Sequence, residues 1–173
     1  NIALGYDALA ANTTGTKNLA IGKGALDAAD TESNNIAIGL DALGGAVAGG
    51  EYNVAIGNYA LDAAVGGGTN EGDDNVAIGD NALSANTTGS YNTAVGTEAG
   101  EATTTGGNNV FVGADAGDEN TTGEQNIIIG SGSDVGAADG LSPITNRIVI
   151  GYGAVGQGDN IAGIGSAAVT KVY

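Results

Sequence analysis

The sequence predicts an all-β protein, a parallel β-solenoid built from about ten short coils. Three observations lead to this prediction. A five-residue segment recurs ten times, the copies lie as little as 14 residues apart, and 33 of the 173 residues are glycine. Glycine does not recur at every third position and there is a single proline, so a collagen triple helix is excluded. Because 42% of the residues are apolar, a disordered chain is excluded as well.

The repeated segment has the form Asn, apolar, Ala, apolar, Gly, as in Asn53-Val-Ala-Ile-Gly57. Its copies begin at residues 1, 18, 35, 53, 75, 92, 109, 126, 147 and 161, with the later copies less regular. The closing glycines are spaced by 17, 17, 18, 22, 17, 17, 17, 21 and 14 residues, so insertions fall between the copies. We therefore expect one repeat domain over residues 1–173, as a fragment of a longer fibrous protein.

Each copy is expected to form a short strand, because β-branched residues favour extended structure and a glycine closes the segment. An Ala-Leu pair such as Ala60-Leu61 follows and predicts a second strand in each coil. A period of 14 to 17 residues is too short for leucine-rich or paired-helix repeats. A short helix over residues 60–64 is the competing local interpretation, which stacking of the coils should override. Ten coils rising ~4.8 Å each would make a rod on the order of 50 Å long.

Alternation within the strand predicts that the first and third apolar residues, such as Val54 and Ile56, fill the coil. The middle residue would then face outward. A water-exposed row would carry polar side chains, yet this row is apolar, so another surface must cover it. We expect it to be the interface of a cyclic assembly of identical chains, formed by Ala3, Ala20, Ala37, Ala55, Ala77, Ala94, Phe111, Ile128 and Val149.

The asparagine that opens most copies predicts a structural ladder, because stacked Asn side chains can hydrogen-bond from coil to coil and tolerate a tight corner. The closing glycine is expected to take a positive φ or to permit close backbone approach. The ladder comprises Asn18, Asn35, Asn53, Asn75, Asn92, Asn109 and Asn126.

Charge and composition exclude several functions. Four basic against 20 acidic residues give a net charge of −16, which would repel nucleic acid and anionic lipid. No apolar run approaches the ~20 residues that cross a bilayer, so no membrane contact is expected of this segment. Without His or Cys, neither a Ser-His or Cys-His nucleophile nor an ordinary zinc site can be built, and we expect no enzyme.

Carboxylates are the remaining chemical groups. Glu98 with Asp115, and Glu101 with Asp118, share register in adjacent coils and are a candidate Ca²⁺ site. The same pairs could act as glycosidase acids or could form a solvated acidic edge, and no cofactor other than Ca²⁺ is expected. Thr87, Thr104 and Thr121 also share register, as a partial threonine array or as simple turn residues.

The Asn-Val-Ala-Ile-Gly unit followed by Ala-Leu resembles the YadA-like head repeat over the entire chain. The resemblance implies a left-handed parallel β-roll that trimerises, as in trimeric autotransporter adhesins. The Asn-Thr-Thr-Gly insertions and the final stretch from Gly156 to Tyr173 are more similar to the β-rolls of phage and bacterial tail-fibre-like proteins. Neck and coiled-coil heptads, which follow an adhesin head, are not seen.

The expected function is that of a non-enzymatic, extracellular trimeric head or shaft that acts in cell adhesion or receptor binding, on a bacterial surface or a virion fibre. The alternatives are a carbohydrate-cleaving tail spike and a purely structural filament subunit. The expected partner is a host-surface protein or glycan, and two insertions, residues 65–74 and 135–145, are candidate contact loops. The contact residues of the first are Gly66, Gly67, Gly68, Thr69, Asn70, Glu71, Gly72, Asp73 and Asp74.

Overall fold

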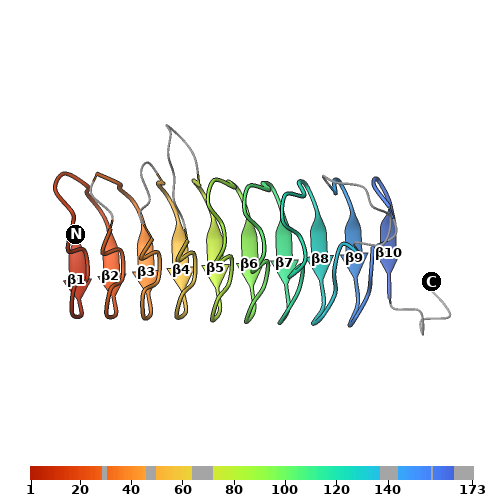
Figure 1. The fold of residues 1–173 in the computed structure, drawn as a ribbon, viewed down its shortest axis with the longest axis horizontal. Coiled ribbons are helices and arrows are strands. Elements are labelled where there is room, and N and C mark those ends of the chain that lie inside the picture. The colour runs from red at the N-terminus through yellow and green to blue at the C-terminus, as the bar shows by residue number, and fades with distance from the viewer. Residues whose placement is uncertain (29–30, 46–49, 64–71, 137–143, 157, 166–173) are drawn as a thin grey trace.

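The computed structural model of the chain is an all-β solenoid with one strand in each coil (Figure 1). It describes residues 1–173 except 29–30, 46–49, 64–71, 137–143, 157 and 166–173. Each strand coincides with the apolar triplet of one repeat. The strands are β1 (Ile2–Leu4), β2 (Leu19–Ile21), β3 (Ile36–Ile38), β4 (Val54–Ile56), β5 (Val76–Ile78), β6 (Thr93–Val95), β7 (Val110–Val112), β8 (Ile127–Ile129), β9 (Ile148–Ile150) and β10 (Ala162–Ile164).

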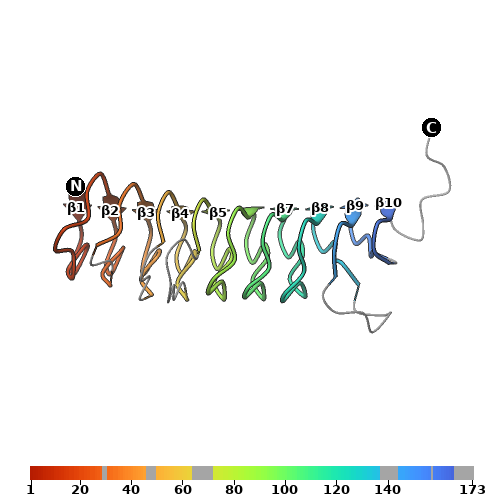
Figure 2. The ribbon, with the colours of Figure 1, turned by 90° about the horizontal axis from the view of Figure 1, so that it is seen from above.

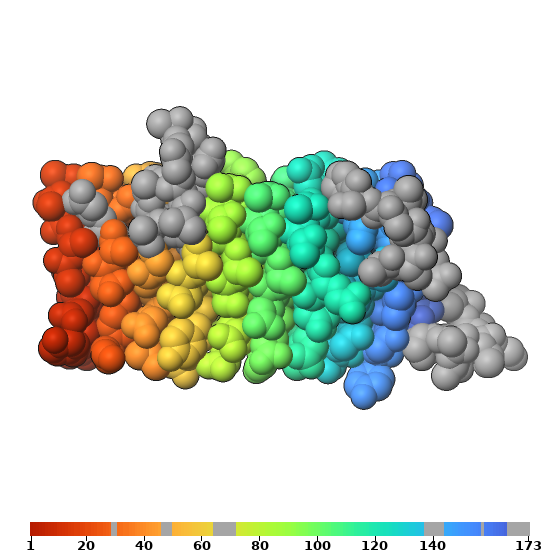
Figure 3. Space-filling view, in the orientation of Figure 1, coloured from red at the N-terminus to blue at the C-terminus, as the bar shows by residue number. Residues whose placement is uncertain are grey.

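The ten strands form a single parallel sheet in which the order along the sequence is also the order in space. Equivalent residues of neighbouring repeats are paired, for example Ala37 with Ala55 and Ala55 with Ala77. Figure 2 shows the strands in a nearly straight row along one side of the molecule, with the turns on the other side. In the space-filling view, each coil is a band across the rod (Figure 3).

The second strand expected in each coil is not formed in the described residues. The Ala-Leu segments are turns, and so are residues 60–63, where a helix was the competing interpretation. The leucine takes a left-handed backbone, with φ of 52° at Leu61 and 51° at Leu83. This conformation turns the chain sharply, so one strand and a set of turns suffice to complete a coil of 17 residues.

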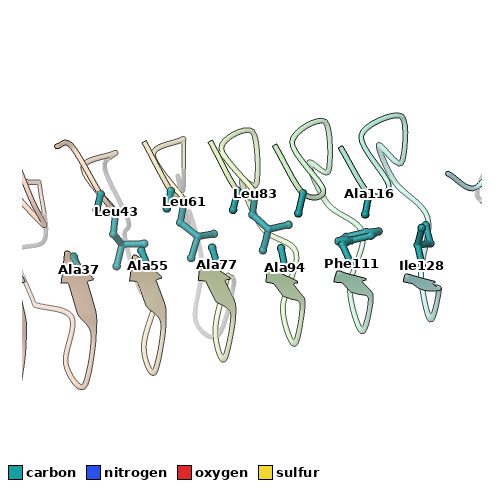
Figure 4. Packing of buried hydrophobic residues seen from close by; sticks show 14 of the residues in the cluster. Ala37, Leu43, Ala55, Leu61, Ala77, Leu83, Ala94, Phe111, Ala116 and Ile128 are labelled. Carbon is teal, nitrogen blue, oxygen red and sulfur yellow. The ribbon is translucent and has the colours of Figure 1, made fainter. Parts of the chain in front are cut away.

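The prediction that the middle residue of each strand faces outward is wrong. Ala20, Ala37, Ala55, Ala77 and Ala94 have no exposed surface, and their side chains lie inside the coil. Phe111, Ile128 and Val149 continue the same buried row, and only Ala3, in the terminal strand, is exposed. The row packs on leucines such as Leu43, Leu61 and Leu83 from the turns (Figure 4). It is the core of a single chain and therefore cannot be the interface between chains.

The inversion has a physical reason. The coil is narrow, so the residue on the strand must be small where a leucine enters from the opposite turn. Alanine fits beside leucine, whereas two β-branched residues on each strand would overfill the interior. The larger Ile and Val side chains flanking the alanine therefore point away from the core and are half-buried or exposed.

The closing glycine is required at the corner after each strand. Gly57 has φ of 139°, and a Cβ added to it would overlap the carbonyl oxygen of Gly79 in the next coil. Any side chain here would push neighbouring coils apart and break the pairing of the strands. This position accounts for the invariance of glycine among the ten repeats.

Candidate binding surfaces

The outer face of the sheet carries two apolar rows, which we call the outer apolar rows. They consist of the first and third residues of each strand, and Thr93 is the single polar member in β2 to β9. About a third of the surface remains exposed at Ile78, Val95, Ile127 and Ile129. The rows are Leu19, Ile36, Val54, Val76, Thr93, Val110, Ile127 and Ile148, and Ile21, Ile38, Ile56, Ile78, Val95, Val112, Ile129 and Ile150.

The asparagine row forms a continuous hydrogen-bonded ladder inside the rod. The backbone N–H of each Asn donates to the side-chain oxygen of the Asn in the preceding coil, as from Asn92 to Asn75 at 2.9 Å and from Asn109 to Asn92 at 3.0 Å. The side-chain amide also donates to a backbone carbonyl, as from Asn92 to Gly106 at 2.8 Å. Both ends of the buried amide are therefore used, which makes this row structural.

Two rungs of the ladder differ beside the long insertions. The Nδ2 atom of Asn53 is buried and has no hydrogen-bond partner among the described residues. In the ninth repeat Arg147 replaces asparagine. Its N–H still donates to the Asn126 side chain at 3.0 Å, while its buried guanidinium bonds to the carbonyls of Val135 and Gly136 and to Asp159. The longer side chain reaches carbonyls that an asparagine could not.

The carboxylates expected to hold Ca²⁺ form an edge of like charges. The neighbouring Glu101 carboxylate raises the pKa of Glu98, and burial and Asp115 contribute to the same shift. Burial raises the pKa of Asp118. In the described part of the chain, no three His, Cys, Asp or Glu side chains are arranged to hold a metal ion, so the geometry gives no support to this site.

A second acidic edge, which the sequence prediction missed, lies in the N-terminal coils. Burial and the nearby Asp41 raise the pKa of both Asp27 and Asp62. The signal was present, because Asp27 and Asp62 each follow an Ala-Leu pair at the same place in the repeat. In both edges, burial and neighbouring carboxylates raise the pKa of carboxyl groups in the described residues.

The threonine array is part of the backbone network. The hydroxyl of Thr87 donates to the carbonyl of Thr104, and the hydroxyl of Thr104 donates to the carbonyl of Thr121, both at 3.0 Å. These hydroxyls join adjacent turns, so they are committed to stacking of the coils.

The residue that precedes the first residue of each repeat, from the second repeat onward, forms another row, which we call the pre-strand row. All its members have a left-handed backbone, with φ between 55° and 63°. Sequence reasoning did not identify this row, although its constant place before the asparagine could have revealed it. It comprises Lys17, Asn34, Tyr52, Asp74, Tyr91, Asn108, Gln125, Asn146 and Asn160.

The insertions expected to contact a receptor fall mostly outside the described residues. This applies to Gly66 to Glu71 of the first loop, to residues 137–143 of the second, and to residues 166–173. Of the first loop, Gly72 is buried, Asp73 is half-buried and Asp74 is exposed. Asp73 accepts a hydrogen bond from the backbone N–H of Glu51 at 2.7 Å, so its side chain joins two coils.

Comparison of the chain with protein-family models, curated proteins and solved structures gave no match. Among the described residues, no helix has the length and apolar character needed to span a membrane.

Proposed function

We propose that this chain is a non-enzymatic segment of an extracellular trimeric fibre, a rigid head or shaft that acts in adhesion or receptor binding. The observation that carries the proposal is the pair of outer apolar rows on a straight parallel sheet. The resemblance of the repeat to YadA-like heads supplies the order of the assembly and the adhesive role.

The outer apolar rows need a cover. Parallel strands that are apolar on both faces are normally buried on both faces, and flat sheets of many strands are normally stabilised by stacking. The inner face of this sheet packs on the chain's own turns, whereas the outer face is open to solvent along the rod. Three copies that turn this face inward would bury all sixteen positions of the two rows.

The negative charge of the chain limits which surfaces can bury the outer apolar rows. With −16 per chain, a copy repels other copies wherever acidic edges meet, but the outer apolar rows contain no carboxylate. Association through this face therefore brings no carboxylate of the two rows into the contact. Because salt screens the remaining repulsion, the assembly should become stronger as ionic strength rises.

Light scattering on the purified chain with Val95→Asp and its matched control Thr97→Asp tests the proposal. Val95 lies in the outer apolar rows, whereas Thr97 lies in an exposed turn, and each variant adds one negative charge. We expect three chains for the wild type and for Thr97→Asp. Val95→Asp should give monomers, because three carboxylates would meet at a desolvated seam.

A wild-type protein that stays monomeric at millimolar concentration and high salt would overturn the trimer. Equal masses for both variants would show that the contact between copies lies outside the outer apolar rows. Incubation with capsular polysaccharide or lipopolysaccharide tests the non-enzymatic role, because release of oligosaccharide would favour a cleaving tail spike.

A further inference from the structure

We propose that the pre-strand row is a binding site for a neutral, extended polysaccharide, with Tyr52 and Tyr91 as stacking platforms on either side of Asp74. The inference deepens the proposed receptor-binding role and rests on it for its biological meaning.

The two tyrosines stand in a conformation that does not suit them. Tyr52 has φ of 60° and Tyr91 has φ of 62°. A left-handed backbone is sterically unfavourable for a residue with a bulky side chain, and only Gly, Asn and Asp adopt it routinely. Five of the nine members of the row are Asn or Asp, which shows what the position favours.

At Tyr52 and Tyr91, burial of the side chain offsets only part of this cost. The left-handed leucines of the turns, such as Leu61, are fully buried and gain free energy from that burial. In contrast, Tyr52 is 56% exposed and Tyr91 is 60% exposed. A strained conformation that packing does not reward is a reason to infer a function.

The frame beneath the tyrosines is rigid. The backbone N–H of Tyr91 donates to the carbonyl of Asp73 at 3.0 Å, and the N–H of Asp74 donates to the carbonyl of Glu51 at 3.0 Å. A side chain also joins two of these coils, because the backbone N–H of Asp73 donates to Ser90 Oγ at 3.1 Å. The rings therefore project from fixed points, which lowers the entropic cost of binding a ligand.

The residues of the pre-strand row favour a neutral sugar polymer as the ligand. Asn34, Asn108 and Gln125 bring amides, which give and accept hydrogen bonds as sugar hydroxyls do. The acidic rod disfavours an anionic polymer. The N–H groups of Tyr52, Asp74 and Tyr91 already donate to the preceding coil, so no peptide strand can pair with them.

The spacing of the row fits a linear polymer. The coils repeat at about one strand separation, ~4.8 Å, and the two tyrosines are two coils apart. In an extended β-1,4-linked chain, successive sugars are turned over, so every second sugar presents the same face. Tyr52 and Tyr91 can thus stack on alternate sugars, while Asp74 accepts hydrogen bonds from the hydroxyls of the sugar between them.

The test is isothermal titration of the folded chain with three neutral hexamers, cellohexaose, chitohexaose and β-1,4-mannohexaose, and with anionic hexagalacturonate. We expect at least one neutral hexamer to bind and the anionic hexamer not to bind. Tyr52→Asn and Tyr91→Asn should each weaken binding about tenfold, the usual loss at an aromatic contact residue. If no neutral hexamer binds at millimolar concentration, or if hexagalacturonate binds best, the proposal fails.

Tyr59→Asn is the matched control, because Tyr59 also has a left-handed backbone, with φ of 57°, but lies in the turn after β4. It should leave binding unchanged. Asparagine suits this conformation, so all three variants should keep or raise the melting temperature. A lower melting temperature, or a changed mass, for Tyr52→Asn or Tyr91→Asn would assign the rings to folding or to contacts between copies and overturn the site. If the wild type is a trimer that binds no hexamer, the fibre proposal stands and the sugar-binding site is overturned. If the wild type is a monomer that binds a neutral hexamer, the sugar-binding site stands and the trimer is overturned.

Discussion

The coils of β2 to β5 and the coils of β7 to β9 fill the same interior in opposite ways. In the first group, alanine on the strand faces a leucine from the turn, as with Ala55 and Leu61. In the second group the strand carries the larger residue, Phe111, Ile128 or Val149, and glycine or another residue stands where leucine was. The coil after β6 is the junction, because it pairs Ala94 with Gly100.

The exchange conserves volume. Phe111 occupies the space that leucines fill elsewhere, and a Cβ added at Gly117 would overlap its ring. A Cβ at Gly100 would lie 2.6 Å from the same ring and 3.0 Å from Leu83. The interior is therefore specified by the sum of two positions in the repeat, and neither position alone defines it.

The two solutions differ in backbone cost. A leucine in a left-handed turn loses roughly 1–2 kcal/mol to conformation and regains about as much or more by burial. Gly117, with φ of 69°, adopts the turn without that cost, but then the strand residue must provide the apolar surface. The second group thus depends on a few large side chains, and the first depends on many leucines.

The largest effect is expected from Phe111→Ala. Deleting a fully buried ring should lower the free energy of unfolding by about 3–5 kcal/mol, because the coils cannot close the resulting cavity. Urea denaturation followed by circular dichroism measures this loss.

A double-mutant cycle with Gly117→Leu sharpens the comparison of the two groups. Gly117→Leu alone should cost about 1–3 kcal/mol by overpacking against Phe111. Combined with Phe111→Ala it should recreate the pairing of the first group, so the double variant should be more stable than Phe111→Ala. Strict additivity of the two losses would show that the positions do not share one space.

Leu61→Ala tests the first group. It should cost about 2–5 kcal/mol by the same cavity argument, since Leu61 is almost fully buried beside Ala55 and Ala77. Denaturation with urea gives the value. If the loss is only a few tenths of a kcal/mol, the leucines are not the filling of these coils.

Asp134 occupies the place of leucine in the eighth repeat and gives the second group a dependence on pH. Burial is the main cause that raises the pKa of Asp134 to about 7. The folded state then binds the proton more tightly than the unfolded state. Its stabilising effect is complete below the ordinary pKa of 3.8 and is lost as the pH rises through 7.

We therefore expect the wild type to be more stable at pH 5 than at pH 8.5, by on the order of 2 kcal/mol from this group. The shifts at Asp27 and Asp62 act in the same direction. Asp134→Asn should flatten the profile and raise stability at pH 8.5, whereas Asp80→Asn on the surface should not. Thermal melts across this range provide the measurement, and an unchanged profile for Asp134→Asn would contradict the assignment.

The repeat predicted the solenoid, the position of every strand and the place of the asparagine ladder, because these follow from a period that is written in the sequence. The prediction failed at the second strand of each coil, which is replaced by turns in the described residues, and at the choice of face. Alternation distinguishes two faces of a strand, but when both are apolar it cannot say which is inside. The leucine of the turn determines which face is inside, because it leaves room only for alanine on the strand beside it. The second acidic edge and the pre-strand row were missed, although both occupy a constant place in the repeat. The significance of the pre-strand row depends on its left-handed backbone, which the spacing alone does not give.

The smallest effect is expected from Ile56→Ala, which separates the inner from the outer side of one coil. Ile56 is half-buried in the outer apolar rows, so the isolated chain should lose only about 1 kcal/mol, well below the loss for Leu61→Ala. In an assembled trimer the same side chain is covered, and the loss should grow with protein concentration because assembly is linked to folding. Urea denaturation at two protein concentrations a hundredfold apart measures both regimes. A loss equal to that of Leu61→Ala at the lower concentration would return Ile56 to the core, whereas a small loss at both concentrations would leave the outer apolar rows without a partner copy.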